Sequence, residues 1–386
     1  MDFSFTEEQQ MLQESTRRYL ESGYTLEHRA KAIAGDDGWS TDTWSGLAEL
    51  GLLALDIDEA DGGIGAGPVG TMLVAQATGG RLLVEPFLSS AVVATRVISL
   101  LAAGARRSQM LDALAAGEAT AVLAHEEDGG WFDARATTAA AEGDGWRLSG
   151  RKARIYHAPM ARWLLVTART ADGLGVFVVD PGTDGVRLRP MRTTDGQRAA
   201  DIELDLVLPQ DARLGEGDAS AALDEVLDRG IAALCADALG VLDRTLAATV
   251  GYARERKQFG VPIGSFQALQ HRMADMYMQV EQARSMTYLA TSACLQDDPA
   301  ARRKAVSGAK VIVGQAARRV GQEAVQLHGG MGMTDELDVS HCFRRLLAFE
   351  LRLGTTDEHL HALLESGPPQ GVGGQRTDSS IRATGG

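Results

Sequence analysis

The spacing of apolar residues changes twice along the chain, and this change constrains the fold more than any other feature. Residues 1–116 and 215–366 carry apolar residues at helical spacing, whereas residues 117–214 consist of short Val-, Leu- and Ile-rich segments separated by turn residues. Because the two patterns are segregated, the sequence predicts an α+β fold. A helical N-terminal domain, a middle β domain and a helical C-terminal domain are expected in that order.

The middle segment is typical of an antiparallel, barrel-like β domain. Asp-Gly steps stand between the expected strands, within residues 143–145, 171–173 and 181–185. Such steps favour the tight turns of β-hairpins, so each of the three is expected to join neighbouring strands.

The C-terminal segment is expected to form a bundle of four long antiparallel helices. One apolar stripe covers residues 223–250, and further helical runs cover 266–295, 299–327 and 338–351. Residues 367–386 are rich in Gly, Pro, Ser and Thr, and they are predicted to form a disordered tail.

Charge and cysteine content exclude several functional classes. The 386 residues include 38 Lys and Arg against 52 Asp and Glu, a formal net charge of -14. This acidic balance argues against binding to nucleic acid or to an anionic membrane. No apolar run approaches the ~20 residues that cross a bilayer, and the polar N-terminus is unlike a signal peptide. Three widely spaced cysteines form no CxxC pair, so a cytoplasmic protein is expected.

Several familiar site motifs are weak or missing. Residues 65–70 fit G-x-G-x-x-G, but the surrounding pattern is helical, which favours an interhelical loop over a dinucleotide site. The histidines are scattered, and His359 and His361 point apart on a helix, so no metal site is predicted. The sequence also contains no G-x-S-x-G nucleophile elbow.

Two segments of the C-terminal half are more informative. Residues 252–260 read Tyr-Ala-Arg-Glu-Arg-Lys-Gln-Phe-Gly, and Phe266-Gln267 follows shortly after. Residues 326–333 read Gln-Leu-His-Gly-Gly-Met-Gly-Met, and such glycines permit close approach of backbone N–H groups to an anion. Each segment alone is also compatible with an ordinary helix C-terminus.

Taken together, these segments resemble the acyl-CoA dehydrogenase family, flavoproteins that oxidise the α,β bond of acyl thioesters. The resemblance extends over residues 1–365 and includes the Glu-Leu-Gly-Leu-Leu at 49–53 and the Asp-Gly-Gly-Ile-Gly at 61–65. Within the family, residues 266–276 and 331–337 are most similar to the small subunit of bacterial pimeloyl-CoA dehydrogenase and related non-catalytic subunits.

The resemblance implies FAD as the cofactor. Arg256 matches the family's arginine on the flavin pyrophosphate, a strong charge-assisted pairing, and Phe259 would pack on the cofactor. The other FAD-binding residues that the resemblance implies are Gln258, Gln267, Gln326, Gly329, Gly330 and Thr355. In the family these groups reach a neighbouring subunit's flavin, which implies an oligomer, typically a dimer of dimers.

The catalytic base of the family has no acidic match in this sequence. The usual glutamate precedes a Gly-Thr pair near the C-terminus, and here Leu353 precedes Gly354-Thr355. Some relatives carry the base on the first long helix of the bundle, where Gly230 is the match. Because removal of an α-proton needs a positioned base, the catalytic residue stays unassigned. Glu350, one turn before Leu353, is the alternative.

The segments that surround the flavin ring in the family also differ. The family reads T-E-P-x-x-G-S-D, where residues 125–133 read His-Glu-Glu-Asp-Gly-Gly-Trp-Phe-Asp, so Glu126 replaces the threonine and Phe132 the serine. The later W-I-T segment reads Arg-Ile-Tyr at 154–156. The three adjacent carboxylates at 126–128 are expected to repel a reduced anionic flavin.

These departures lead to one hypothesis and two alternatives. The chain is expected to be the small, base-lacking subunit of an α2β2 acyl-CoA dehydrogenase, which supports the FAD of a homologous catalytic subunit. Such complexes act on dicarboxylyl or steroid side-chain thioesters, and electron-transferring flavoprotein is the implied electron acceptor. The alternatives are a self-sufficient homotetrameric dehydrogenase that uses Glu350 and a flavin-free structural homologue.

Overall fold

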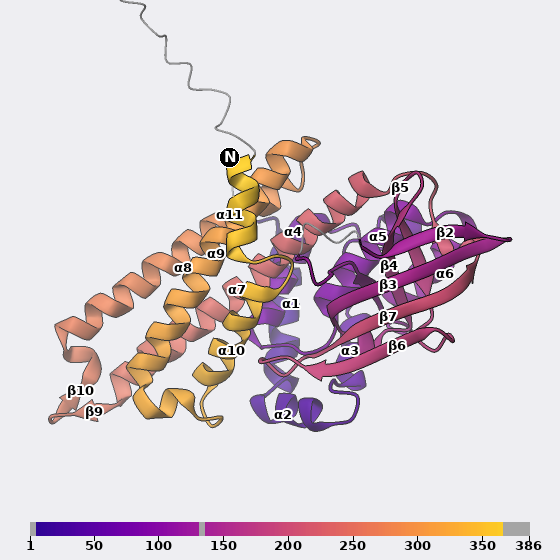
Figure 1. The fold of residues 1–386 in the computed structure, drawn as a ribbon. Coiled ribbons are helices and arrows are strands. Elements are labelled where there is room, and N and C mark those ends of the chain that lie inside the picture. The colour runs from indigo at the N-terminus through magenta and orange to yellow at the C-terminus, as the bar shows by residue number, and fades with distance from the viewer. Residues whose placement is uncertain (1–4, 131–135, 366–386) are drawn as a thin grey trace, which may run out of the picture.

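The computed structural model describes residues 5–130 and 136–365. Its elements fall into three groups in chain order, which confirms the α+β fold expected from the apolar spacing (Figure 1). The predicted tail at 367–386 lies outside the described residues.

The first group is helical. Its elements are α1 (Glu7–Gly23), α2 (Leu26–Ala34), α3 (Thr41–Glu49), α4 (Gly67–Gly80), a π-helix (Phe87–Ala94), α5 (Thr95–Leu101) and α6 (Gly104–Ala115). Thr6 and Gln9 begin α1 with a reciprocal capping box. Residues 65–70 lead from a loop directly into α4 without a preceding strand, in agreement with the interhelical loop. The π-helix is an unusual element that often marks a functional site.

The second group forms one sheet with the strand order β6-β7-β3-β2-β4-β5-β8, and β1 lies beside β4. The strands are β1 (Ala121–Ala124), β2 (Thr138–Glu142), β3 (Gly145–Tyr156), β4 (Trp163–Thr170), β5 (Gly173–Val179), β6 (Val186–Arg192), β7 (Arg198–Pro209) and β8 (Arg213–Leu214). The Asp-Gly steps at 143–145 and 171–173 are confirmed as the turns of the β2–β3 and β4–β5 hairpins.

Two details of the predicted β domain were wrong. Residues 181–185 join β5 to β6, and these strands are not neighbours, because β6 pairs with β7 and the free side of β5 pairs with β8. The β1–β4 and β2–β4 pairs are parallel, so the sheet is not antiparallel throughout. Turn residues determine a local reversal of the chain, whereas strand order depends on contacts between distant segments.

The third group is the helical bundle. It contains α7 (Ser220–Glu255), α8 (Gln267–Ala293), α9 (Pro299–His328), α10 (Asp338–Leu351) and α11 (Thr356–Glu365). The short strands β9 (Lys257–Gln258) and β10 (Val261–Pro262) form a hairpin between α7 and α8. The four predicted helices are present, and α11 is an additional short helix.

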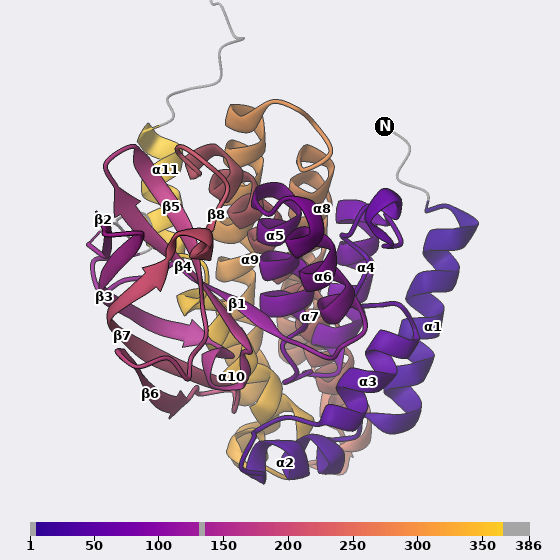
Figure 2. The same ribbon diagram turned by 90° about the vertical axis from the view of Figure 1, so that its right-hand side faces the viewer.

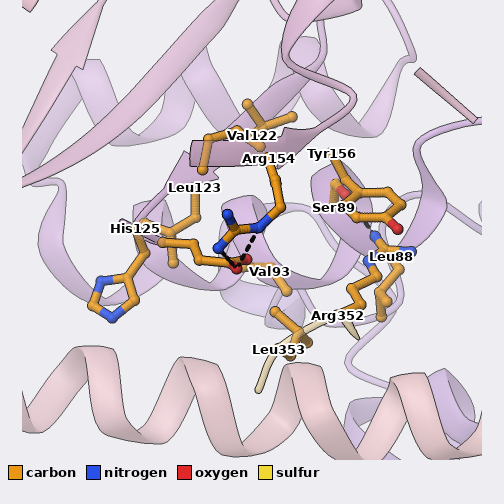
Figure 3. A pocket seen from close by; sticks show the side chains of 12 residues that line it. Leu88, Ser89, Val93, Val122, Leu123, His125, Arg154, Tyr156, Arg352 and Leu353 are labelled. Atoms are coloured by element: carbon orange, nitrogen blue, oxygen red, sulfur yellow. Dashed lines mark hydrogen bonds and ion pairs between the residues drawn. The ribbon is translucent and has the colours of Figure 1, made fainter. Parts of the chain in front are cut away.

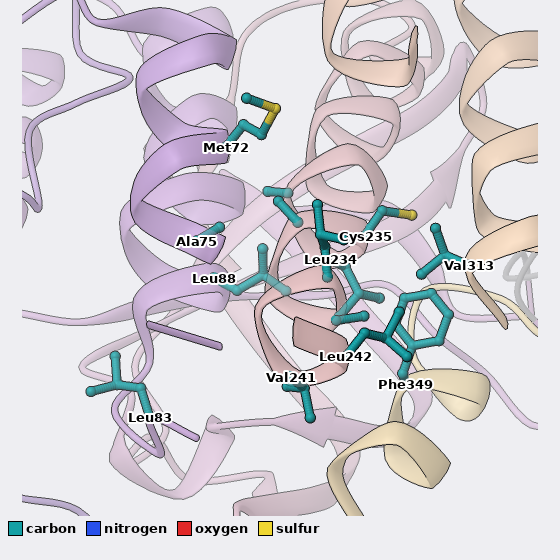
Figure 4. Close-up of a cluster of buried hydrophobic side chains, with 14 of the residues drawn as sticks. Met72, Ala75, Leu83, Leu88, Leu234, Cys235, Val241, Leu242, Val313 and Phe349 are labelled. Carbon is teal, nitrogen blue, oxygen red and sulfur yellow. The ribbon is translucent and has the colours of Figure 1, made fainter. Parts of the chain in front are cut away.

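Helix α7 joins the three groups. Figure 2 shows it between the N-terminal helices and the strands, and Figure 4 shows its Leu234, Cys235 and Leu242 among apolar side chains of the neighbouring helices. Glycines allow α4 and α7 to touch: a Cβ added at Gly79 would lie 2.0 Å from the carbonyl oxygen of Asp237. The backbones of α4 and α7 are therefore in direct contact at this point.

Candidate active site

A small cavity lies where the π-helix, the β domain and the end of α10 meet (Figure 3). Its volume is about 50 Å³. It is lined by Leu88, Ser89, Val93, Val122, Leu123, His125, Glu126, Arg154, Ile155, Tyr156, Arg352 and Leu353. Pockets that hold drug-sized ligands measure about 300–1,000 Å³, so this cavity is far smaller than such a site.

The two positions that match the family's catalytic bases meet beside this cavity. A Cβ added at Gly230 on α7 would lie 3.5 Å from Cδ1 of Leu353. Leu353 adopts a left-handed backbone with φ 55°, which is uncommon for a residue with a branched side chain. Two distant segments thus converge on one point, although neither supplies a carboxylate there.

An ion pair crosses the cavity. The Arg154 guanidinium donates from Nη2 and Nε to Oε1 of Glu126, at 2.6 and 3.1 Å (Figure 3). A register shift in the β3–β7 ladder between Lys152 and Ile155, together with φ 54° at Arg154, directs the arginine away from the ladder and into the cavity. Burial raises the pKa of Glu126 even though Arg154 lies beside it.

Each of the three adjacent carboxylates at 126–128, which were expected to repel a reduced flavin, has a cationic partner in this chain. Beside the Glu126–Arg154 pair, Glu127 accepts from Lys152 Nζ at 2.6 Å, and Asp128 accepts from Arg151 at 3.0 Å. The repulsion expected from residues 126–128 is therefore largely neutralised within the chain. The predicted replacement at Phe132 lies outside the described residues.

A buried hydrogen-bonded chain behind the cavity was not predicted from the sequence. His157 Nε2 lies 3.2 Å from the carbonyl oxygen of Val84, which can only accept, so Nε2 carries the hydrogen and Nδ1 accepts from Ser89 Oγ at 2.8 Å. Arg352 Nη2 donates to the same Ser89 oxygen at 2.8 Å and lies over the ring of Tyr156. Burial lowers the pKa of His157 well below its usual value.

Glu350, the alternative base, faces away from the cavity. Its two carboxylate oxygens accept from the backbone N–H and the hydroxyl of Thr356, at 3.0 and 2.7 Å. Glu350 thus satisfies donors at the first turn of α11, and it is not among the residues that line the cavity.

The FAD-binding residues expected near 256–267 lie at the far end of the bundle. Arg256 ends α7, Gln258 belongs to β9, and Gln267 begins α8; all three are exposed. Phe259 forms the tip of the hairpin, where its side chain is 93% exposed and its φ is 54°. No described side chain pairs with the Arg256 guanidinium, so this end of the molecule offers an exposed cation and an exposed aromatic ring.

Gln326, Gly329 and Gly330 lie at the same end of the bundle, and all three are exposed. The ring of Tyr252 on α7 stacks on His328 with 4.3 Å between centroids and so joins the two segments. The structure therefore brings together the two motifs that are 70 residues apart in sequence. Neither Tyr252 nor His328 was predicted as a site residue, although both stand within those motifs.

Thr355 lies apart from this group, on the side of the cavity. It caps α11 through reciprocal hydrogen bonds with Glu358. The neighbouring Thr356 packs against Gly314 of α9. Gln326 lies 12 residues further along the same helix, which is about 18 Å at 1.5 Å per residue. Thr355 is therefore far from the FAD-binding residues expected around Gln326.

Three further observations concern metal, thiol and membrane features, none of which the sequence predicted. They contain no group of three or more His, Cys, Asp or Glu side chains arranged to hold a metal ion. The three cysteines are free and buried. Among the described helices, none combines the length and the apolar content that a membrane span requires.

Family comparison matches this three-part architecture along the chain. The acyl-CoA dehydrogenase N-terminal domain matches residues 6–118, the middle domain matches 121–207, and the C-terminal domain matches 220–367. The chain belongs to the acyl-CoA dehydrogenase family, FAD-dependent oxidoreductases that act on acyl-CoA.

Similar proteins come from several bacteria. The chain is 30% identical to the probable acyl-CoA dehydrogenase YngJ of Bacillus subtilis, with 92% of this chain and 97% of that protein covered. It is also 30% identical to acyl-CoA dehydrogenase FadE27 of Mycobacterium tuberculosis, with 92% and 95% covered. Among solved structures, the Tcur3481-Tcur3483 steroid acyl-CoA dehydrogenase variant is 31% identical, with a TM-score of 0.86 and 93% and 97% covered. The ChsE4-ChsE5 complex of Mycobacterium tuberculosis is 28% identical, with a TM-score of 0.87 and 96% and 100% covered.

The Glu126–Arg154 pair lies in the cavity that adjoins the family's base positions, and the space of about 50 Å³ between the described lining residues is smaller than a flavin ring needs. The exposed residues around Arg256 and Phe259 do suit a pyrophosphate and an aromatic group held mainly by another chain.

Proposed function

We propose that this chain is the small, non-catalytic subunit of a heteromeric acyl-CoA dehydrogenase. The observation that carries the proposal is the Arg154–Glu126 pair across a cavity of about 50 Å³, directly beside Leu353. The space between the described residues that line this cavity is smaller than a flavin ring or an acyl thioester. The exposed residues at the other end of the bundle remain suited to a neighbour's cofactor.

The proton chemistry of the family supports the same assignment. Dehydrogenation at the α,β bond requires a carboxylate that takes the α-proton. Among the described residues that line the cavity, Glu126 is the one carboxylate, and its oxygen already accepts two hydrogen bonds from Arg154. We therefore assign the catalytic base to a homologous partner chain.

The role of this chain would be to bind the adenosine end of the partner's FAD, which supplies the electron-accepting chemistry. Arg256 would neutralise the pyrophosphate, and Phe259 would cover an apolar part of the cofactor. Gln258, Gln267, Gln326, Gly329 and Gly330 would add hydrogen-bonding groups at the same end. Thr355 lies beside this chain's own cavity, so in this arrangement it would not contact the partner's FAD.

The similar solved structures support a heteromeric assembly. The Tcur3481-Tcur3483 steroid acyl-CoA dehydrogenase and the ChsE4-ChsE5 complex each combine two different proteins. By this likeness we propose an acyl-CoA with a steroid side chain, or another bulky or dicarboxylyl acyl group, as the substrate of the complex. Electron-transferring flavoprotein is the proposed acceptor, and the cytoplasm is the proposed location.

The proposal is tested by the flavin content of the native complex. Purification through a tag on this chain is expected to yield a homologous partner and one FAD for every two chains, measured by mass and flavin absorbance. Arg256→Met should reduce FAD retention by about tenfold or more, since a charged hydrogen bond contributes about 1.5–3 kcal/mol. Arg254→Met, at a neighbouring exposed arginine on α7, is the matched control and should leave FAD retention unchanged.

Two results would contradict the proposal. An isolated chain that binds one FAD and desaturates an acyl-CoA would favour the self-sufficient dehydrogenase. A native assembly that contains no flavin would favour the structural homologue.

A further inference from the structure

Tyr252 contacts both of the segments proposed to bind FAD: the hairpin segment, residues 252–267, and the glycine segment, residues 326–333. Its ring stacks on the ring of His328, with 4.3 Å between the centroids and 26° between the planes. Its backbone carbonyl oxygen accepts from the N–H of Arg256 at 2.8 Å, the hydrogen bond that ends α7. One residue therefore connects the arginine of the hairpin segment with the end of α9.

His328 is held in one orientation. The residue is 6% exposed. Its Nδ1 lies 2.8 Å from the carbonyl oxygen of Ala324, which can only accept, so Nδ1 carries the hydrogen and donates it. Burial lowers the pKa of His328, so the ring that stacks on Tyr252 is mainly neutral at pH 7.

The glycine segment folds back onto His328. A Cβ added at Gly332 would lie 3.0 Å from the Cβ of His328 and 2.8 Å from the carbonyl oxygen of Val325. Gly329, directly after His328, has φ 61°, a conformation that favours glycine. The position of His328 therefore determines where the backbone N–H groups of the glycine segment lie.

The ring stack is the main polar or aromatic connection between the two segments. Among the described residues, the hydrogen bonds, ion pairs and ring contacts that join residues 252–267 to residues 326–333 are those of Tyr252 with His328. The Tyr252 hydroxyl lies 3.5 Å from the carbonyl oxygen of His328, which is long for a hydrogen bond, so the ring stack is the stronger contact.

We propose that the stacked rings of Tyr252 and His328 are a positioning pair, which fixes the spacing between Arg256 and the glycine segment so that both bind one FAD of the partner subunit. This inference rests on the proposed function. Without the pair, the two segments must be ordered when the cofactor binds, and the cost of that ordering weakens the affinity.

The test is the FAD dissociation constant of the native complex, measured by flavin fluorescence after removal of FAD and titration with it. Tyr252→Leu should raise the dissociation constant about fivefold or more, whereas Tyr252→Phe, which keeps the ring, should stay within about twofold of the wild-type value. Tyr288→Leu is the matched control, because this half-buried tyrosine packs edge-to-face on Phe5 toward the other end of α8. It should leave the FAD dissociation constant unchanged.

A second measurement needs no flavin. Trypsin cleaves after arginine and lysine, so cleavage of the full chain after Arg254, Arg256 or Lys257 reports local opening of the hairpin segment. Tyr252→Leu should accelerate this cleavage, and Tyr252→Phe and Tyr288→Leu should not.

The outcomes separate this inference from the proposed function. If Arg256→Met weakens FAD binding and Tyr252→Leu does not, the inference is wrong and the proposed function stands. If neither substitution weakens FAD binding, both are wrong. If Tyr288→Leu weakens FAD binding and accelerates cleavage as much as Tyr252→Leu does, the effect is a general loss of stability, and the inference is overturned.

Discussion

The buried ion pair between Lys152 and Glu127 allows a test of what stabilises the segment that carries Glu126. Lys152 Nζ donates to Glu127 at 2.6 Å, to Thr167 Oγ1 at 3.1 Å and to the His125 carbonyl oxygen at 3.2 Å. The side chains of Lys152 and Glu127 are 0% and 4% exposed. This pair holds the segment that carries Glu126, so its loss should be felt at the cavity as well as in overall stability.

Lys152→Met keeps the length of the side chain and removes its charge. Breaking a buried pair by removal of one partner costs about 3–5 kcal/mol, because the other charge stays buried. Glu127 retains hydrogen bonds from the backbone N–H groups of Ala136 and Thr137, so we expect a loss near the lower limit, about 3 kcal/mol. Equilibrium urea unfolding, followed by circular dichroism, measures the change.

A double-mutant cycle separates the ion pair from the loss of packing. Glu127→Gln in the Lys152→Met background should restore part of the lost stability, because the neutral amide removes the unpaired buried charge while its oxygen still accepts from one of the two backbone N–H groups. Equal stability of Lys152→Met and the wild-type chain would refute the reasoning. A double variant that loses the sum of the two single effects would refute the coupling.

Three further predictions concern single side chains. Glu350→Gln should lower the free energy of unfolding by about 1 kcal/mol, because its contacts to Thr356 are weakened. Acyl-CoA turnover by the native complex should stay unchanged. Loss of turnover with an intact fold would instead identify Glu350 as the base. Phe259→Ser should change the unfolding free energy by less than about 0.5 kcal/mol but reduce FAD retention, and unaltered retention would contradict its role. Burial lowers the pKa of His359 to about 4 in the folded chain. As the pH falls below about 6.5, the unfolded chain therefore takes up a proton at this residue while the folded chain does not. The free energy of unfolding should decrease by up to about 3 kcal/mol between pH 6.5 and 4. His359→Asn should flatten that profile in acid titrations, whereas His361→Asn, at an exposed position of the same helix, should not.

The sequence predicted those parts of the fold that depend on local patterns. Helical spacing and two of the three Asp-Gly hairpins are local, and both agree with the structure. Helix α11 was missed, although Thr355 and Glu358 form a Thr-x-x-Glu capping box that marks its start. The prediction that residues 181–185 join neighbouring strands was wrong, because strand order depends on long-range contacts.

The sequence predicted the candidate site where a linear motif identifies a position. It did not predict how the side chains are oriented or which of them are buried. The family resemblance identified Leu353 and Gly230 as the two positions of the base, and the structure brings them together. The orientation of Arg154 depends on a bulge in β3, and the environment of Arg352 depends on side chains from three separate segments. Neither is visible in the order of the residues, because a lone charge reads as a solvated surface group.

The position of Leu353 beside an ion pair limits how a base could be introduced there. A change of that one residue to glutamate would place a carboxylate at the family's position, next to the Glu126–Arg154 pair. A change of residue 126 or 154 alone would leave the other member of the pair without its partner. A glutamate at 353 would therefore need matching changes at both of these positions.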